Sequence, residues 1–267
     1  MIRCIALDLD DTLLRSDLTI DAADQQAIRR AVATGVTVLL ASGRMVQSMR
    51  PYVEQLGLDV PLIAYNGAII QEAISGKILY HLPVPSQEAL RLLPVFRRRG
   101  VHLNAYVNDQ LYMDELTVWG QKYAANAGVI PHPVGDLGPV LAEGQPHKLL
   151  GVGELEQVDA LRKELEVEFN GVLQFVKSKP NYLEILAPGV SKGQALAELT
   201  RSWGFKPEEV MAVGDAPNDL SMICWAGVGV AIGNARDEVK QAADLVVADH
   251  DHQGVAEAIE RVVFGRE

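Results

Sequence analysis

Short apolar segments alternate with helix-type patterns in the first part of the chain. Ile2–Leu9 and Val36–Ala41 are nearly continuous apolar runs of strand length, which is typical of strands buried on both faces of a sheet. Apolar residues then recur at helical spacing up to Gly35, and Val46–Leu56 repeats this pattern before a third apolar run, Val60–Ala64. Strand, helix and strand in this order, with short connections, predict parallel strands joined by right-handed crossovers.

The same alternation returns in the C-terminal part of the chain. Gln194–Trp203 and Asp219–Ala226 are predicted helices, whereas Val210–Val213 and Val228–Ile232 are predicted strands. The two ends of the sequence therefore predict a single α/β core with a Rossmann-like parallel sheet.

Between these parts the pattern changes to strands separated by short turns. Val101–Val107 and Leu111–Met113 predict a hairpin that turns at Asn108-Asp109, and Val172–Val176 with Tyr182–Leu186 predicts a second hairpin. Consecutive hairpins indicate an inserted α+β domain with a largely antiparallel sheet, and prolines stand at both of its ends. We therefore divide the chain into a first core segment, an inserted domain and a second core segment: residues 1–84, 85–188 and 189–267.

The composition excludes several classes of protein. Of the 267 residues, 48% are hydrophobic and 22% are charged, which is too apolar for a disordered chain. No apolar run reaches the roughly 18 residues that a membrane-spanning helix needs. The 24 Lys+Arg and 35 Asp+Glu residues give a net charge of −11, whereas nucleic-acid-binding proteins usually carry a basic surface. We therefore expect neither a membrane nor a nucleic acid as a partner.

The sequence also predicts a cytoplasmic protein. Acidic residues interrupt the first apolar run early, which argues against a signal peptide. Cys4 and Cys224 stand far apart in apolar stretches, and we interpret both as reduced thiols of the core. No pattern in the sequence indicates an oligomeric state.

Three carboxylates follow the first predicted strand directly. Asp8, Asp10 and Asp11 stand where Ile2–Leu9 ends, and open α/β sheets bind their ligands at the carboxyl ends of parallel strands. Asp8 and Asp10 are two residues apart, so they point to the same side of an extended chain. Such a pair needs a cation to offset its repulsion; the simpler alternative is an acidic loop without further function.

Two further polar segments accompany the predicted strands and helices. Ser42-Gly43 follows Val36–Ala41, and a hydroxyl with free backbone N–H groups is suited to an anionic oxygen, although such turns are common in any protein. Lys192 stands in the first turn of a helix, where the helix dipole disfavours a cation, and Ser191 before it is a candidate N-cap. The unfavourable place of the lysine is modest evidence for a function.

Asp215, Asn218 and Asp219 follow the predicted strand Val210–Val213, and alone they are also interpretable as turn and cap residues. Asn66, after the third apolar run, is interpreted either as a pocket residue or as a turn residue. Taken together, acids at two strand ends predict a site of hard oxygen ligands suited to Mg²⁺. The nearby serine, lysine and asparagine are suitable donors to a phosphoryl group.

In this order, DLDDTL, SGR, the lysine of SKG and GDAPND resemble the motifs of the haloacid dehalogenase-like (HAD) superfamily of aspartyl-phosphate hydrolases. The position of the insert and the ending GVSKG…AVGDxxNDLSM resemble the Cof-type subfamily, whose inserted cap domain is of the α+β (type IIB) kind. The resemblance implies the HAD fold with such a cap. Asp11 and Ala216 depart from the residues common in the family, but neither stands at a chemical position.

The resemblance also implies a role for each matched residue. Asp8 would be the nucleophile that becomes an aspartyl phosphate, and Asp10 would protonate the leaving alcohol and then activate water. Mg²⁺ would be held by Asp8, Asp10 through its backbone carbonyl, and Asp215, with Asp219 in a supporting role. Arg44 is a candidate supporting residue, interpreted from its position after a strand either as a pocket residue or as a helix cap. The residues implied to contact the substrate phosphate are Leu9, Ser42, Gly43, Lys192 and Asn218.

The sequence thus predicts a Mg²⁺-dependent phosphatase that acts on a small phosphorylated metabolite, such as a phosphosugar, a nucleotide or a cofactor phosphate. An acid at Asp10 favours a phosphatase or mutase over a transport ATPase, because hydrolysis of the intermediate needs a base beside it. Two alternatives stay open: a phosphosugar mutase that uses the same intermediate, and a phosphometabolite-binding sensor with weak activity. The intact set of Asp8, Asp10, Lys192 and Asp215 argues against the sensor.

Overall fold

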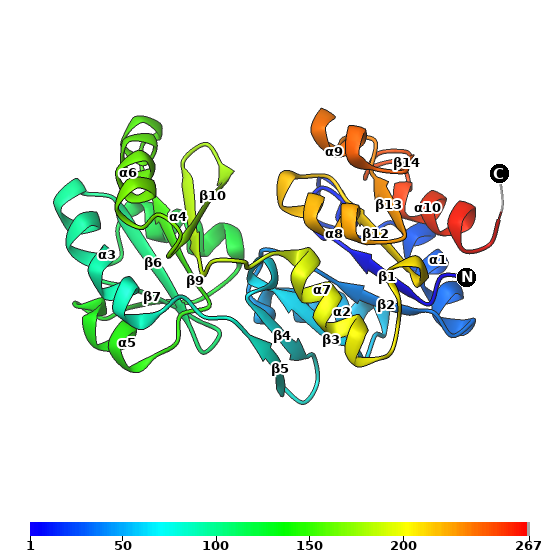
Figure 1. The fold of residues 1–267 in the computed structure, drawn as a ribbon, viewed down its shortest axis with the longest axis horizontal. Coiled ribbons are helices and arrows are strands. Elements are labelled where there is room, and N and C mark those ends of the chain that lie inside the picture. Colours follow the sequence, from blue (N-terminus) through cyan, green and yellow to red (C-terminus); the bar gives the residue numbers. More distant parts are fainter. Residues whose placement is uncertain (266–267) are drawn as a thin grey trace. The chain divides into compact units, whose positions relative to one another are not determined.

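The computed structural model describes residues 1–265, and the chain divides into two compact units. The first unit consists of Met1–Tyr80 and the segment from Ser191 onwards, and the second is His81–Val190. Figure 1 follows the chain through the first unit in blue and cyan, through the second in green, and back into the first in yellow to red. Within the described residues no helix is both long and apolar enough to cross a membrane.

A five-stranded parallel sheet forms the centre of the first unit. Its strand order is β14-β13-β12-β1-β2, so that β1 lies between β12 and β2. Leu7, the last residue of β1, pairs with Val213 on one side and Leu40 on the other. The strands are β1 (Cys4–Leu7), β2 (Thr37–Leu40), β12 (Val210–Gly214), β13 (Val228–Ala231) and β14 (Leu245–Val246). The predicted α/β fold with a parallel core sheet is confirmed.

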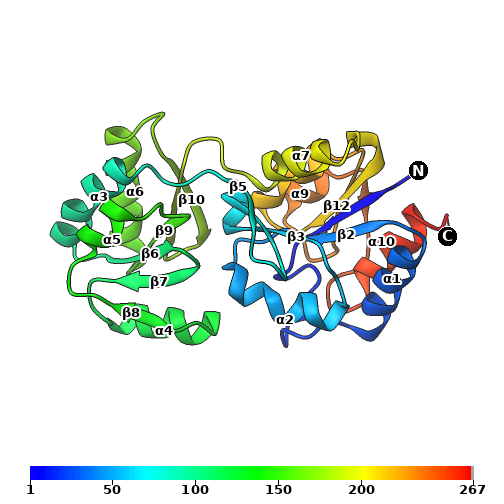
Figure 2. The ribbon, with the colours of Figure 1, turned by 90° about the horizontal axis from the view of Figure 1, so that it is seen from below.

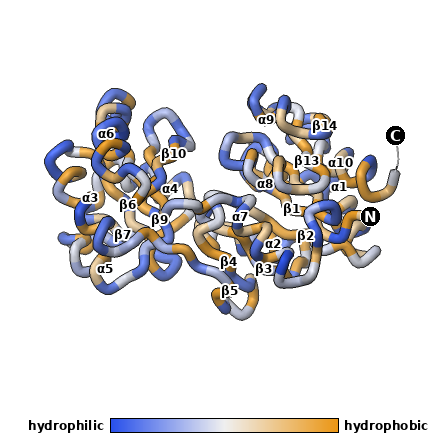
Figure 3. The backbone as a smooth tube through the Cα atoms, in the orientation of Figure 1, coloured by the Kyte–Doolittle hydropathy of each residue, from blue (hydrophilic) through white to orange (hydrophobic). Residues whose placement is uncertain are grey.

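Helices cover both faces of this sheet, as Figure 2 shows, with α7 on one face and α1 and α10 on the other. Leu196 and Leu199 of α7 are buried in one cluster with Cys4 and Ala6 of β1, which explains why α7 lies against this face. Figure 3 shows β1 and β2 as hydrophobic segments and much of α9 as hydrophilic. The helices of this unit are α1 (Ala22–Ala33), α2 (Val46–Leu56), α7 (Lys192–Ser202), α8 (Leu220–Trp225), α9 (Asp237–Ala242) and α10 (Gly254–Val262).

The third apolar run does not become a strand of the parallel sheet. Instead β3 (Pro61–Ala64) pairs antiparallel with β4 (Ile69–Glu72), and β5 (Ile78–His81) completes a separate three-stranded sheet. A single parallel bridge between Ala41 and Ile63 is its link to the end of β2. The predicted strand is confirmed, but its parallel alignment with β2 is limited to this one bridge, while its other edge pairs with β4.

The two cysteines differ in their surroundings. Both are free; Cys4 is fully buried in β1, and burial raises the pKa of its thiol to about 12. Cys224 is exposed on α8, a short helix that buries Met222 and Ile223 instead. The interpretation of Cys224 as a core thiol is wrong, because the apolar stretch around it forms a helix with only one buried side.

The second unit is built on a six-stranded sheet in the order β10-β11-β9-β6-β7-β8, antiparallel except for β7 and β8. Asn108 and Asp109 form the predicted turn of its central hairpin with φ angles of 51° and 57°, as a two-residue hairpin turn of this hand requires. The strands are β6 (His102–Val107), β7 (Gln110–Met113), β8 (Pro131–Pro133), β9 (Lys148–Val152), β10 (Gln174–Lys179) and β11 (Tyr182–Leu186). The helices are α3 (Ser86–Arg99), α4 (Val118–Ala127), α5 (Leu137–Glu143) and α6 (Leu155–Glu168).

A buried carboxylate joins α1 to α10 in the first unit. Asp24 is 1% exposed, and its Oδ1 accepts a hydrogen bond of 2.7 Å from the backbone N–H of Ala256. Its second oxygen, Oδ2, has no hydrogen-bond partner among the described residues. Burial therefore raises the pKa of Asp24 to about 6, although the bond from Ala256 acts in the opposite direction.

This shift predicts a pH-dependent stability. The folded state binds more protons than the unfolded state between about pH 4 and 6, so the stabilisation is present at low pH and is lost as the pH rises through 6. Because one pKa unit corresponds to about 1.4 kcal/mol, the rise from 3.8 to about 6 corresponds to a loss of about 3 kcal/mol. Asp24→Asn keeps an acceptor for Ala256 without a charge. The difference in free energy of unfolding between Asp24→Asn and wild type, measured in urea, is expected to increase from pH 4.5 to pH 7. For the surface variant Asp59→Asn, the same difference should not change with pH. A pH-independent difference for Asp24→Asn would contradict the prediction.

Candidate active site

Asp8, just beyond the end of β1, meets a lysine from the first turn of α7. Lys192 Nζ lies 2.5 Å from Asp8 Oδ1 and 2.6 Å from Asp219 Oδ1. Lys192 and Asp219 are fully buried, and Asp8 is almost so. Residues from three distant parts of the sequence are thus joined by two short, buried ion pairs.

The first turn of α7 is shaped to hold this lysine. Ser191 is the N-cap, because its side chain accepts a hydrogen bond of 3.1 Å from the N–H of Gln194. The next residue but one, Gly193, donates its N–H to Ser221 Oγ at 3.0 Å. A Cβ atom at Gly193 would lie 2.2 Å from the carbonyl oxygen of Ser221, so only glycine allows α7 this close to α8. The two carboxylates offset the unfavourable place of Lys192 in the helix dipole.

A cluster of three carboxylates surrounds the end of the sheet. Asp8, Asp215 and Asp219 each offer an oxygen atom, and these atoms lie within 4.8 Å of one another. Asp219 Oδ2 accepts hydrogen bonds of 3.0 Å from the N–H groups of Asp215 and Ala216, which fixes the turn after β12. Thr12 donates its hydroxyl to Asp215 Oδ1 at 3.2 Å. The turn and the hydroxyl together orient the Asp215 carboxylate.

The charges of this cluster are only partly balanced. Burial raises the pKa of Asp8 well above its usual range, and the carboxylate of Asp219 is the second largest cause. The same two causes raise the pKa of Asp215 to about 7. Burial opposes the charged form of Lys192, but Asp219 and Asp8 outweigh it and raise the lysine pKa. One lysine among three carboxylates leaves an excess of negative charge. A divalent cation with a preference for hard oxygen ligands, such as Mg²⁺, fits this donor set.

Asp10 turns its carboxylate to an arginine. Arg44 binds it in bidentate fashion, with Nε 2.8 Å from Oδ2 and a terminal nitrogen 2.6 Å from Oδ1. This hydrogen bonding raises the pKa of Arg44, and the guanidinium also lies 3.4 Å from the Tyr52 hydroxyl. The chain leaves the extended conformation and turns at Asp11, where φ is 58°. The Asp10 carboxylate is outside the three-carboxylate cluster.

The candidate phosphate-binding residues from the other loops lie around an asparagine. Asn218 donates its amide to Asn66 Oδ1 at 3.0 Å, and a Cβ atom at Gly43 would lie 3.0 Å from the same Oδ1. Ser42 is 1% exposed, and its Oγ accepts a hydrogen bond of 3.2 Å from the Arg44 N–H. Asn66 is buried, with φ of 59°, in the turn after β3. Its side chain reaches both the loop that contains Gly43 and the loop that contains Asn218.

Two residues of the first motif complete the site. Leu9 is fully buried, and its carbonyl accepts backbone hydrogen bonds from Thr12, Leu13 and Leu14, which closes a tight loop beyond Asp8. Sequence analysis assigned no role to Thr12, yet it is fully buried against Asp215. Its place in the DLDDTL motif is the signal that could have found it.

Comparison with known proteins agrees with this architecture. Residues 5–259 match the family model described as haloacid dehalogenase-like hydrolase. The chain is 32% identical over 269 residues to the 5-amino-6-(5-phospho-D-ribitylamino)uracil phosphatase YcsE of Bacillus subtilis, with 98% of this chain and 96% of that protein covered. It is 31% identical over 266 residues to the pyridoxal phosphate phosphatase YbhA of Escherichia coli, with 96% and 97% covered.

Solved structures give the same result. A haloacid dehalogenase-like hydrolase from Bacteroides thetaiotaomicron superposes with a TM-score of 0.91 at 31% identity, covering 98% of this chain and 100% of that one. A protein from Thermotoga maritima superposes with a TM-score of 0.89 at 33% identity, covering 98% of both chains. The chain belongs to the haloacid dehalogenase-like hydrolase family. The resemblance seen in the sequence is thereby confirmed, as is the predicted enzyme class, a phosphatase.

Proposed function

We propose that this phosphatase hydrolyses small phosphomonoesters with Mg²⁺ through a covalent aspartyl phosphate on Asp8. The observation that carries the proposal is the position of Asp8 at the end of a central strand, with its carboxylate against Lys192 and among Asp215 and Asp219. Sugar, nucleotide and cofactor phosphates are the proposed substrates. The two phosphatases named above act on a phosphorylated ribitylaminouracil and on pyridoxal phosphate, which supports a substrate of this size.

The reaction takes place in two displacements at phosphorus. In the first, Asp8 forms a bond to phosphorus while the bond to the alcohol oxygen breaks, and Asp10 gives that oxygen a proton. In the second, Asp10 takes a proton from a water molecule, whose oxygen attacks phosphorus and displaces Asp8. Arg44 binds both oxygens of Asp10 through one hydrogen bond each, and each oxygen keeps a second lone pair at which a proton can be exchanged.

The excess negative charge around Asp8 has to be offset before an anionic substrate binds. Asp8, the backbone carbonyl of Asp10 and Asp215 are the proposed ligands of Mg²⁺, which supplies charge neutralisation at the phosphoryl oxygens. Asp219 keeps its place in the turn and beside Lys192. The proposed donors to the phosphate are Leu9, Ser42, Gly43, Lys192 and Asn218. Their arrangement suits phosphoryl transfer, in which positioning and charge neutralisation dominate.

Removal of the metal is expected to stop hydrolysis of p-nitrophenyl phosphate. After treatment with EDTA and desalting, the rate should fall by about 100-fold or more, because the loss of a cation at a phosphoryl group costs several kcal/mol. Added Mg²⁺ should restore the rate, whereas Ca²⁺ should restore little, because it takes more ligands at longer distances. Circular dichroism before and after the treatment is the control for folding. Full activity in EDTA would overturn the metal dependence.

The predicted cytoplasmic location stays a prediction.

A further inference from the structure

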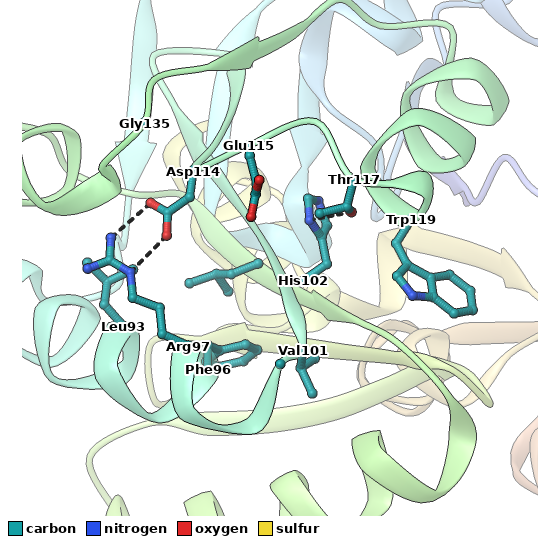
Figure 4. Close-up of a pocket in the computed structure, with 12 residues that line it drawn as sticks. Leu93, Phe96, Arg97, Val101, His102, Asp114, Glu115, Thr117, Trp119 and Gly135 are labelled. Carbon is teal, nitrogen blue, oxygen red and sulfur yellow. Dashed lines mark hydrogen bonds and ion pairs between the residues drawn. The ribbon is translucent and has the colours of Figure 1, made fainter.

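The second unit contains a cavity that none of the proposed active-site residues lines. Its volume is about 610 Å³, within the range of small-molecule binding sites. Figure 4 shows the cavity between the end of α3, the start of β6 and the segment that leads from β7 into α4. All of its lining residues belong to the second unit.

The walls of the cavity are largely apolar and partly aromatic. Phe96 of α3 and Trp119 of α4 supply the aromatic rings, and Leu93, Val101 and Leu103 supply aliphatic surface. Phe96 is 1% exposed and anchored in the core of the unit, so this wall is rigid. Aromatic faces favour an apolar group and also attract a cation placed over them.

Among the described residues, the only cation that lines the cavity is already paired with carboxylates of the protein. Arg97 binds Asp114 through two nitrogens, at 2.9 and 3.0 Å, and binds Asp136 at 2.6 Å. His102 is buried, and burial lowers its pKa, so the ring is neutral. Its two nitrogens are engaged by Thr117 and by Asn104, each at 2.9 Å.

Glu115 is the charged group without a partner. In the described chain, residues 1–265, its carboxylate forms no hydrogen bond or ion pair, and Figure 4 shows it directed into the space above Phe96 and Val101. Glu115 is exposed. With Arg97 neutralised by Asp114, the cavity presents a net negative charge to a ligand. An anion such as phosphate is repelled here, in contrast to the site at Asp8.

We infer that this cavity binds a small primary amine with an aromatic or branched apolar body. The ammonium group pairs with Glu115, and the apolar body lies against Phe96 and Trp119. An ammonium has three donors, and a carboxylate is a strong partner for it, because a hydrogen bond between two charged groups is about twice as strong as one between neutral groups. This second site is independent of the proposed hydrolysis, since it shares no residue with the active site.

Binding of 2-phenylethylamine to the full chain tests this inference by isothermal titration calorimetry. We expect saturable binding with one amine per chain, and Glu115→Gln should weaken it about tenfold, the effect of losing one charge-assisted hydrogen bond. Glu156→Gln, an exposed glutamate of the same unit, is the matched control and should bind as wild type does. Trp119→Ala should weaken binding as well. Unchanged urea midpoints of the variants establish that they are folded.

Two analogues separate the charge from the apolar body. The neutral 2-phenylethanol should bind at least about tenfold more weakly than the amine, and 3-phenylpropionate should not bind. Asp8→Asn should bind the amine as wild type does, so that a failure of the proposed hydrolysis is distinguishable from a failure of this site. The inference is overturned if no saturable binding occurs up to about 10 mM, if Glu115→Gln binds the amine equally well, or if the alcohol equals the amine.

Discussion

Asp8→Asn is expected to lower the kcat for p-nitrophenyl phosphate by about 10³-fold or more. The amide has no lone pair of comparable nucleophilicity, so the covalent intermediate is not formed. Asparagine keeps the shape of the side chain and an oxygen that accepts from Lys192 Nζ, which lies 2.5 Å away in the native protein. The loss of rate therefore reports on the nucleophile rather than on a collapse of the site.

Initial rates at saturating Mg²⁺ measure this effect, and the neighbouring acid supplies the control. Asp11 is exposed and belongs to the same motif, so Asp11→Asn should hydrolyse the ester at nearly the wild-type rate. Borohydride reduces an acyl phosphate to an alcohol, so wild type quenched during turnover should yield homoserine at position 8 in peptide mass spectra. Asp8→Asn at the wild-type rate, with no such peptide from the wild type, would exclude the covalent mechanism.

The central strands of the core were predictable because they are buried on both faces. Ile5 and Val38 lie in β1 and β2, where every residue except Thr37 is buried, and such apolar runs identify a strand without help from its neighbours. The run at Pro61–Ala64 is equally apolar, yet it pairs with Ile69–Glu72. Composition specifies burial but not the partner, and the partner was decided by a tight turn at Tyr65–Gly67 that periodicity does not reveal.

The members of the candidate site were also largely predictable, but their pairings were not. Asp8 and Asp215 follow strands that lie side by side, so the rule for parallel sheets alone brings them together. The bidentate contact between Arg44 and Asp10 depends on how two loops turn after their strands end. Side-chain direction in such loops follows from local φ angles, as at Asp11, and these carry no repeating pattern in the sequence.

Glycines of the site show the same limit. Gly214 directly follows a predicted strand and has no positive φ angle, yet a Cβ atom there would lie 2.5 Å from Cβ of Asp219. The requirement comes from the fold of the turn that carries Asp219 back over the strand. Close approach of this kind is a property of two segments, and one segment's sequence does not reveal it.

Lys192→Met is expected to cost both stability and activity. The substitution keeps the length of the side chain but leaves Asp8 and Asp219 buried without their cation, and the loss of one partner from a buried ion pair costs about 3–5 kcal/mol. Without metal, the urea midpoint of the variant should therefore fall clearly below that of the wild type. Since Mg²⁺ at the proposed site offsets the charge of Asp8, its addition should raise the midpoint of the variant more than that of the wild type.

The activity of Lys192→Met separates this lysine from a purely structural residue. Under conditions where the variant is folded and saturated with Mg²⁺, its kcat should still be about 10²-fold lower, because a preorganised charge beside the phosphoryl oxygens is missing. Lys77→Met replaces an exposed lysine of the same unit and should change neither quantity. If Mg²⁺ restored both the midpoint and the kcat of Lys192→Met to wild-type values, the lysine would serve only to neutralise Asp8 and Asp219. A persistent loss of kcat places its charge in the hydrolysis itself.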